Sequence, residues 1–372
     1  MENIFEDSRI IGENSPRQSA FMGNSIGSCF KRAAVGRDSG SLSAAMGLIS
    51  GILSAGTDVY DVGECTAPEV YKASRMCDCD ACIFVRQDPL IKADIRGSGG
   101  LPLLEGENKR ISGKLNSEEM FIACSEGDLT DMSGIRRVYR QETEERLIGS
   151  ERYRVTFCRS GMSGRRSADY SSDKEEMTVA LSADGTKASL YTKPSGFISM
   201  DELIMIKCLE LFEKGENAAL PFCFPCIADS FAKEHGCRIL RYYTAHGNGS
   251  DEKARKLAVK QRFTLDGAYL AAEVLSYSDR KGEGLDVLRK RIPDHYTAKR
   301  FVELKEERTK NIMHKFKGRF TPDGAVFEKN SSRVVVQPSS SGKGVWLRAE
   351  SFSMEAAAEL CAGAEEKLRS DT

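Results

Sequence analysis

The stretch that most constrains the fold is a strand–helix–strand pattern near the start of the chain. Residues 33–36 form a short apolar run, and residues 42–55 carry apolar side chains at helical spacing, namely Leu42, Ala45, Met46, Ile49, Ile52 and Leu53. Gly56 is expected to end this helix, and residues 58–63 are expected to form the next strand. Because a helix that joins two neighbouring strands makes a right-handed crossover, the pattern predicts a mostly parallel sheet with helices on its faces.

Strands and helices continue to alternate along the chain of 372 residues, which is too long for a single core. Further strands are predicted at residues 82–85, 153–158, 177–181, 218–222 and 238–243, and helices at residues 133–147, 200–212, 227–234 and 266–275. The last part differs, because strands at residues 334–336 and 345–348 precede an amphipathic helix at residues 354–368. We therefore predict an α/β protein, with three tandem α/β/α units and a smaller C-terminal α+β unit, at residues 1–148, 149–213, 214–303 and 304–372.

The charge balance and the apolar runs exclude some classes of partner. The net charge of −1 arises from 54 basic and 55 acidic side chains, so no strong field would attract nucleic acid. The longest apolar run, residues 42–55, is interrupted by Ser and Gly and is too short to span a bilayer. The first residues are acidic and lack the apolar core of a secretory signal, so we expect a cytoplasmic protein with no membrane partner.

The 12 cysteines suggest reduced thiols rather than a disulfide scaffold. Two clusters, Cys77-x-Cys79-x-x-Cys82 and Cys223-x-x-Cys226, could supply thiolate ligands to a structural zinc ion. Against this, no paired C-x-x-C at zinc-ribbon spacing is present, and Cys82 opens an apolar run typical of a buried strand. Cysteines that serve as small buried apolar side chains are therefore the favoured alternative.

Five segments follow one another in a recognisable order. Residues 35–39 read V-G-R-D-S, and residues 59–71 contain D-V-G followed by P-E-V-Y. Residues 182–187 read S-A-D-G-T-K, residues 266–268 read D-G-A, and residues 337–343 read Q-P-S-S-S-G-K. In this order they resemble the motifs of the α-D-phosphohexomutase family (phosphoglucomutases, phosphomannomutases and phosphoglucosamine mutases) over nearly the whole chain. The resemblance implies three phosphohexomutase-like α/β domains and a C-terminal α+β domain of the TBP-like type.

The resemblance also implies where the family's chemistry would lie. The phosphoserine loop of the family, T-A-S-H-N-P, corresponds to Arg86-Gln87-Asp88-Pro89, which contains neither Ser nor His and has Arg37 nearby. The magnesium loop of the family, D-G-D-[AG]-D-R, corresponds to residues 182–187, where only Asp184 matches one of the three aspartates. Because Mg²⁺ requires near-octahedral oxygen ligation, a single carboxylate predicts a vestigial metal position, and no cofactor is expected.

The phosphate-clamping loop is the part that keeps plausible chemistry. The family's R-P-S-G-T corresponds here to a Ser-rich loop in which Ser339, Ser340, Ser341 and Lys343 could hold a phosphate dianion through hydroxyl, backbone N–H and ammonium groups. Gln337 stands in place of the arginine, which removes the bidentate contact and is expected to weaken phosphate binding. The alternative is a Ser/Gly-rich hairpin loop without a ligand.

Two further polar side chains lie near the expected site. The family's sugar-recognising loop, G-E-x-S-G-H, has no counterpart before Asp266, although His246 in that region could contact a ligand. Ser98 lies in a glycine-rich segment where the family has a turn and no nucleophile. Neither side chain is expected to be catalytic.

The function has to be argued from these residues rather than from the fold. Since the donor serine and two of the three metal-binding acids are unmatched, we predict a non-catalytic sugar-phosphate-binding or regulatory homologue in carbohydrate metabolism, with a hexose phosphate or a protein as partner. The alternative is an active, divergent phosphoglucomutase or phosphomannomutase, an intramolecular phosphotransferase that would use Arg86, Asp88, Asp184 and Mg²⁺. A zinc-dependent scaffold is a third hypothesis.

Overall fold

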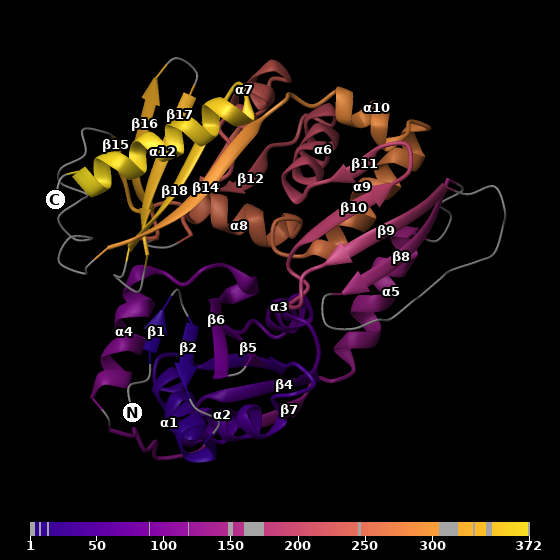
Figure 1. Ribbon diagram of the computed structural model, residues 1–372. Coiled ribbons are helices and arrows are strands. Elements are labelled where there is room, and N and C mark those ends of the chain that lie inside the picture. Colours follow the sequence, from indigo (N-terminus) through magenta and orange to yellow (C-terminus); the bar gives the residue numbers. More distant parts are fainter. Residues whose placement is uncertain are drawn as a thin grey trace.

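The protein has a mixed α/β fold built on four β-sheets (Figure 1). The structure is a computed structural model that describes residues 4–6, 9–12, 15–88, 90–117, 119–147, 152–159, 175–244, 247–304, 319–329, 332–339 and 344–370. The first sheet and its helices form one lobe, and the other three sheets form a second lobe. Among the described helices, none combines the length and the apolar character that crossing a membrane would require.

The first sheet has seven strands in the order β1-β2-β6-β5-β3-β4-β7. These are β1 (Ile4–Glu6), β2 (Arg9–Gly12), β3 (Arg32–Arg37), β4 (Asp58–Glu64), β5 (Ala81–Asp88), β6 (Leu90–Gly97) and β7 (Leu129–Asp131). The strand β3 runs parallel to β4 and β5, but β6, β2 and β1 continue the sheet in antiparallel fashion. The prediction of a mostly parallel sheet is therefore wrong, because a tight hairpin joins β5 to β6 where a parallel pair would need a crossover helix.

Helices cover both faces of the first sheet. The pair α1 (Pro16–Gly27) and α2 (Leu42–Ser54) packs on the face that bears Ala33, Val35 and Ile83. On the other face, α3 (Ala67–Met76) packs against Ala34 and Phe84. Period-two alternation along β3 and β5 thus supplies two apolar faces and explains why this sheet is buried on both sides. The lobe is completed by the short helix η1 (Ser98–Gly100), α4 (Glu105–Asn116) and α5 (Ile135–Leu147).

The helix α2 buries only part of the predicted face, namely Ala45, Ile49 and Ile52. Leu42 and Met46 are 53% and 49% exposed, and the buried positions are Ala44, Ala45, Leu48, Ile49, Gly51 and Ile52. The reason is close packing against α1, since a Cβ at Gly51 would lie 1.9 Å from the carbonyl oxygen of Ala20. The small-residue face of α2 has to turn toward α1, which leaves Leu42 and Met46 at the surface.

The second and third sheets share one hydrophobic core. The second sheet has the order β11-β10-β9-β8, and the third contains only the parallel pair β12 and β13. Their elements are β8 (Tyr153–Arg159), β9 (Glu175–Leu181), β10 (Ala188–Thr192), β11 (Gly196–Ile198), α6 (Met200–Glu213), β12 (Ala218–Pro221), α7 (Ile227–Glu234), β13 (Ile239–Tyr242), α8 (Glu252–Gln261), α9 (Gly267–Lys281) and α10 (Leu285–Lys290). A single buried cluster runs from Tyr153 through Leu209 and Leu220 to Leu275. The expected division at residue 213 therefore does not separate two cores, because a two-stranded sheet buries too little surface to be stable alone.

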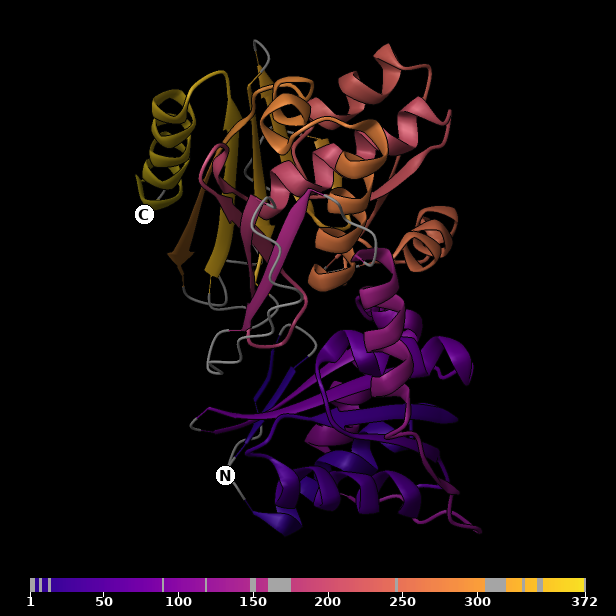
Figure 2. The same ribbon diagram turned by 90° about the vertical axis from the view of Figure 1, so that its right-hand side faces the viewer.

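The fourth sheet has five strands in the order β14-β18-β17-β16-β15. These are β14 (Tyr296–Glu303), β15 (Arg319–Thr321), β16 (Gly324–Lys329), β17 (Ser332–Pro338) and β18 (Gly344–Ser351), and α12 (Met354–Ser370) follows them. Because β14 pairs with β18 along its whole length, this unit begins at Tyr296 and not at residue 304 as predicted. The helix α12 covers the face turned away from the rest of the molecule (Figure 2), so the opposite face is turned toward the other sheets.

Candidate functional site

The residues at the donor position lie at the end of β5. Strands β5 and β6 remain paired up to Asp88 and Leu90, so the chain reverses in a tight hairpin. Arg86 lies near this end, and its Nε is 3.0 Å from Oδ2 of Asp94 on β6. The guanidinium of Arg86 is thus already paired with a carboxylate of its own hairpin. The side chain of Asp88 and the whole of Pro89 lie outside the described residues.

The hairpin is fastened to the end of β3 through Asp38. Its Oδ2 accepts a hydrogen bond from the backbone N–H of Gln87 at 3.3 Å, and its Oδ1 accepts from the backbone N–H of Gly40 at 3.1 Å and from the hydroxyl of Ser41. The neighbouring Arg37 donates from Nη1 to the backbone oxygen of Asp38 at 3.3 Å. Arg37 and Gln87 therefore lie close together at the carboxyl ends of β3 and β5, where Asp38 holds the two strand ends by hydrogen bonds.

Asp184 lies in the turn between β9 and β10, and its carboxylate is used within that turn. Its Oδ1 accepts hydrogen bonds from the hydroxyl of Ser182 at 2.6 Å, the hydroxyl of Thr186 at 2.9 Å and the backbone N–H of Thr186 at 3.1 Å. Burial alone would raise the pKa of Asp184, but these hydrogen bonds and the positive charge of Arg86 hold it below the ordinary value. The influence of Arg86 places the hairpin of β5 and the turn of Asp184 in one neighbourhood.

Backbone hydrogen bonds hold the same turn between the two lobes. The N–H of Ala67, at the start of α3, donates to the carbonyl oxygen of Asp184 at 3.0 Å, and the N–H of Gly267, at the start of α9, donates to that of Gly185 at 3.1 Å. Gly185 has a φ of +80°, a conformation that favours glycine. The turn satisfies N–H groups that two helices would otherwise leave without partners. It is thus a structural junction as well as a candidate site.

The residues present do not fit a three-carboxylate magnesium site. Throughout the described ranges, no three His, Cys, Asp or Glu side chains come together as a metal ion would require. The neighbours of Asp184 at the corresponding positions are hydroxyls that already donate to it. In the same ranges neither cysteine cluster assembles such a set of ligands, so the structure gives no support to a zinc site.

The base of the expected phosphate loop is formed by β17 and β18. The backbone N–H of Ser339 donates to the carbonyl oxygen of Gly344 at 2.8 Å, and Ser339 is buried. Ser340, Ser341 and Lys343 lie outside the described residues, as does His246.

Gln337 ties the base of this loop to the third sheet. Its Nε2 donates to the hydroxyl of Thr244 at 3.3 Å, and that hydroxyl donates to Asp323 at 3.0 Å. A neutral amide therefore occupies the position where the family has a guanidinium.

The glycine-rich turn that contains Ser98 is a packing contact. Gly100 has a φ of +91°, and a Cβ on it would lie 2.4 Å from the ring of Tyr71. Gly99 similarly approaches Val259 of α8, where a Cβ would be 2.8 Å away. The glycines let the lobes approach each other here, and this close packing accounts for the turn without a catalytic role for Ser98.

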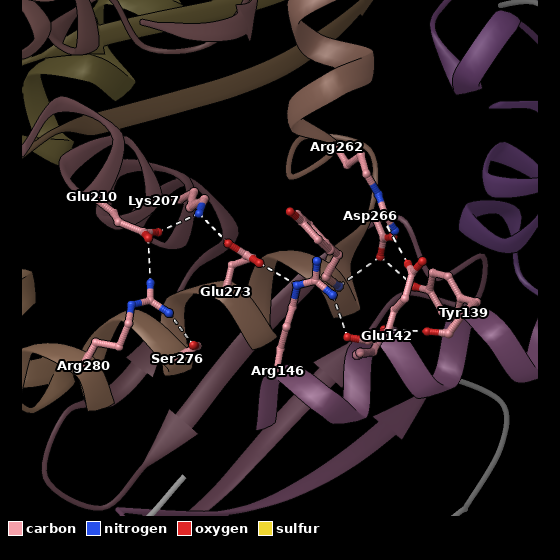
Figure 3. A network of polar contacts seen from close by, with 12 residues as sticks. Tyr139, Glu142, Arg146, Lys207, Glu210, Arg262, Asp266, Glu273, Ser276 and Arg280 are labelled. Atoms are coloured by element: carbon pink, nitrogen blue, oxygen red, sulfur yellow. Dashed lines mark hydrogen bonds and ion pairs between the residues drawn. The ribbon is translucent and has the colours of Figure 1, made fainter. Parts of the chain in front are cut away.

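A network of ionised side chains joins α5, α6 and α9 beside this junction (Figure 3). Glu273 of α9 receives Arg146 of α5 and Lys207 of α6, each at 2.6 Å. Asp266, which caps α9 by accepting from the N–H of Tyr269, also accepts the hydroxyl of Tyr139 at 2.7 Å. Burial raises the pKa of Asp266 above its usual value. The network links both lobes and holds the start of α9 against the turn of Asp184.

Sequence reasoning missed a group of positive side chains on the inner face of the fourth sheet. Lys299 of β14 and Arg348 of β18 lie directly opposite each other, and Arg348 forms an ion pair of 3.1 Å with Asp201 of α6. Lys187, at the end of the turn of Asp184, contributes a third positive charge near Lys299. The predicted boundary assigned residues 296–303 to the preceding unit, so the sequence did not indicate that β14 pairs with β18. Only the cross-strand register reveals this pairing.

We compared the chain with protein-family models, curated sequences and solved structures. No protein-family model matches the chain. A protein of Methanosarcina acetivorans described as a probable phosphoglucosamine mutase is 22% identical over 430 aligned positions, which cover 98% of this chain and 96% of the relative.

Two solved structures of similar fold come from proteins that are named as members of the same family. A phosphoglucomutase/phosphomannomutase family protein from Burkholderia thailandensis superposes with a TM-score of 0.71 and 18% identity, covering 99% of this chain and 97% of that one. The phosphoglucomutase parafusin from Paramecium, in an open form, gives a TM-score of 0.59 and 11% identity, covering 95% and 91% of the two chains. The mixed α/β fold of these proteins therefore extends over nearly the whole of this chain.

Proposed function

Because the chain is a member of the α-D-phosphohexomutase family, we propose that it binds a hexose phosphate beside the turn of Asp184 and does not transfer its phosphoryl group. A place in carbohydrate metabolism follows from the family relationship. The observation that carries the proposal is the use of Asp184 Oδ1 by three donors of its own turn. That oxygen is committed to loop structure and is poorly available to a metal ion.

The physical argument rests on charge. Phosphoryl transfer is catalysed mainly by positioning and by neutralising the charge that develops on the transferring group. In the family three aspartates hold the Mg²⁺ that does this, whereas here two hydroxyls stand beside Asp184. The donor hairpin offers Arg86, which is paired with Asp94, and no serine or histidine. Binding of a sugar phosphate needs fewer of these parts than its turnover.

A second function, an active divergent mutase, is favoured by one observation. The relative from Methanosarcina acetivorans, described as a probable phosphoglucosamine mutase, aligns over 98% of this chain. In that case Asp88 would be the phosphoacceptor, Asp184 would be a ligand of Mg²⁺, and Arg86 would neutralise charge on the transferring phosphoryl group. We rank this function second because Asp184 and Arg86 already have partners within their own turns.

One pair of measurements separates the two functions. Glucose, mannose and glucosamine phosphates are screened for an increase in melting temperature, with and without Mg²⁺, since a ligand that prefers the native state stabilises it. The same samples are assayed for conversion between 1- and 6-phosphorylated sugars in the presence of a sugar bisphosphate. We expect a shift that does not depend on Mg²⁺, and no turnover. Turnover at ordinary enzymatic rates would reverse the ranking.

A matched pair of double variants tests the phosphate loop. Ser339→Ala with Lys343→Ala is expected to reduce the shift. Ser195→Ala with Lys193→Ala makes the same chemical change in the β10–β11 turn, at the far end of β10 from Asp184, and should leave the shift intact. If both double variants behave alike, the phosphate loop takes no part in binding. If no sugar phosphate shifts the melting temperature of the unaltered protein, only a role through a protein partner is left.

A further inference from the structure

A patch of two aromatic and two basic side chains lies on the inner face of the fourth sheet. In the register of β14 and β18, Phe301 lies opposite Trp346 and Lys299 lies opposite Arg348. Alternate residues of β18, such as Leu347, point to the other face and pack under α12. We call the four inward side chains the Trp346 patch.

The aromatic half of the patch is exposed without an evident structural reason. Trp346 is 36% exposed and Phe301 is 41% exposed, and their ring centroids are 4.9 Å apart. The ammonium of Lys299 lies 4.4 Å from the centre of the Trp346 ring, in cation–π contact. A preassembled aromatic surface with a cation beside it is a suitable support for the apolar face of a ring that carries a negative group.

The basic half of the patch contains opposed like charges. Lys299 and Arg348 face each other directly across the strand pair, an arrangement that destabilises a sheet. Arg348 has Asp201 as a partner at 3.1 Å, but within the part of the chain that the structure describes no carboxylate forms an ion pair with Lys299 or Lys187. Burial lowers the pKa of Lys299, and the charges of Arg348 and Lys187 lower it further. A bound dianion would reverse this unfavourable balance of charge.

We propose that the Trp346 patch is the sugar-ring subsite of this protein, in which a hexose phosphate rests its ring on Trp346 and Phe301 and its phosphate on Lys299 and Arg348. This proposal depends on the proposed function, because it assumes that the ligand is a hexose phosphate. Lys187, which follows the turn of Asp184, faces the same phosphate from the second sheet. The subsite therefore joins the turn of Asp184 to the fourth sheet through the ligand.

The charge and the shape of the patch decide between possible occupants. Lys299, Arg348 and Lys187 outnumber two acidic groups, Asp201 and Glu303 on the same face of β14, and leave a net positive charge that selects an anion. Two exposed rings in contact select a ligand with an apolar face as well. Inorganic phosphate satisfies only the first requirement, and an uncharged hexose satisfies only the second. A hexose phosphate satisfies both.

The chain contains a single tryptophan, so its intrinsic fluorescence reports directly on Trp346. Titration with glucose 6-phosphate is expected to change the intensity and shift the emission maximum to shorter wavelength, because the ring loses contact with water. Inorganic phosphate and glucose, added separately, should produce much smaller changes at equal concentration. An equal response to inorganic phosphate would overturn the stacking part of the proposal.

Variants on the two faces of β14 provide a matched control. Lys299→Met removes one charge of the patch and is expected to weaken binding of glucose 6-phosphate, measured by calorimetry, about tenfold. Arg300→Met changes the next residue, which points to α12 and pairs with Glu365, and should leave the affinity unchanged. Trp346→Leu should weaken binding about fivefold.

The outcomes separate this proposal from the proposed function. If glucose 6-phosphate binds by calorimetry but Trp346 emission does not respond and Lys299→Met binds as tightly as Arg300→Met, the patch is not the subsite, and the proposed function stands. If no hexose phosphate binds to the unaltered protein, both fail together. A tenfold loss that is shared by Arg300→Met would refute the patch as well, since that residue lies on the opposite face.

Discussion

Glu273 should stabilise the fold more than any exposed glutamate does, because it is the point where three helices are joined. It lies on α9, and its two oxygens receive Lys207 of α6 and Arg146 of α5, each at 2.6 Å. The side chains of Lys207 and Glu273 are only 7% and 17% exposed, so water screens this ion pair poorly. Removing the charge by Glu273→Gln tests whether the network shown in Figure 3 holds the lobes together.

The expected loss can be worked out from the contacts. Each oxygen of Glu273 has its own partner, and a glutamine keeps only one of the two as an acceptor, because its NH₂ group donates. Lys207 keeps Glu210 at 2.6 Å. What is lost is one hydrogen bond between charged groups and the charge assistance of the other, on the order of 3 kcal/mol in total. Glu365→Gln is the matched control, since Glu365 also has two basic partners, Arg300 and Arg369, but those partners are exposed. Surface pairs of this kind contribute little.

Urea denaturation followed by far-ultraviolet circular dichroism measures both variants. Glu273→Gln should lower the midpoint at unchanged m-value, and Glu365→Gln should leave it almost unaltered. Burial tends to raise the pKa of Glu273, but Lys207 and Arg146 hold it below the usual value. The stabilisation is therefore present above the unfolded-state pKa of about 4.3 and is lost as the pH falls through the lower folded-state value. The reasoning is refuted if the two variants have equal midpoints at neutral pH, or if the difference between them grows in acid.

Two further predictions concern the start of α9. Gly267→Ala should destabilise the protein by about 2 kcal/mol, because the new Cβ would lie 2.5 Å from the carbonyl carbon of Lys187 and the backbones would have to separate. Gly363→Ala, at an exposed helical position with open space around it, should instead be neutral or stabilising in the same thermal denaturation assay. Asp266→Asn should gain stability relative to the unaltered protein as the pH rises from about 4 to 8, as measured by urea midpoints. The sign of this change in stability follows from the raised pKa of Asp266. A carboxyl group with a raised pKa stabilises the fold below the unfolded-state pKa, and this contribution is lost as the pH rises through the folded-state value.

Elements with strong periodicity could be predicted from the sequence, and elements at sheet edges could not. The helix α7 has the bounds 227–234 that its apolar spacing predicts. The strand β14 escaped prediction because Val302 is the only one of its eight residues that is buried, so no alternation of apolar and polar side chains marks it. Its identity depends on pairing with β18, which is a contact over long sequence separation. That missing strand displaced the boundary of the fourth sheet and hid Lys299.

The hydrogen bonds of the candidate site also depend on contacts between residues far apart in the sequence, which the sequence does not reveal. The resemblance of residues 182–187 to the family's magnesium loop predicts a loop there, and the structure has a turn between β9 and β10. The sequence could not show that Ala67 and Gly267 both donate to the backbone of this turn, because these residues come from different lobes. Nor could it show that Asp94 pairs with Arg86. Local patterns identify the residues of a site, whereas their partners depend on the packing of distant segments.

The turn of Asp184 is held together by hydrogen bonds where the family's loop has like charges. In the family's loop three aspartates face one another and repel unless a metal ion lies between them. Here Ser182 and Thr186 occupy the positions of the outer two, and their hydroxyls donate to Asp184 instead of repelling it. Two changes from carboxylate to hydroxyl thus convert a cation-dependent turn into one that satisfies itself.

Replacing these two hydroxyls by carboxylates should make the stability of the turn depend on Mg²⁺. Ser182→Asp with Thr186→Asp replaces two donated hydrogen bonds by two like charges and should cost on the order of 2 kcal/mol without Mg²⁺. Added Mg²⁺ should raise the melting temperature of this double variant, because a bound ion stabilises the native state, and should not raise that of the unaltered protein. Ser182→Ala with Thr186→Ala is the control, since it removes the same hydrogen bonds without adding charge and should be destabilised but not rescued. A double aspartate variant as stable as the unaltered protein in the absence of Mg²⁺ would show that the hydroxyls do not hold this turn together.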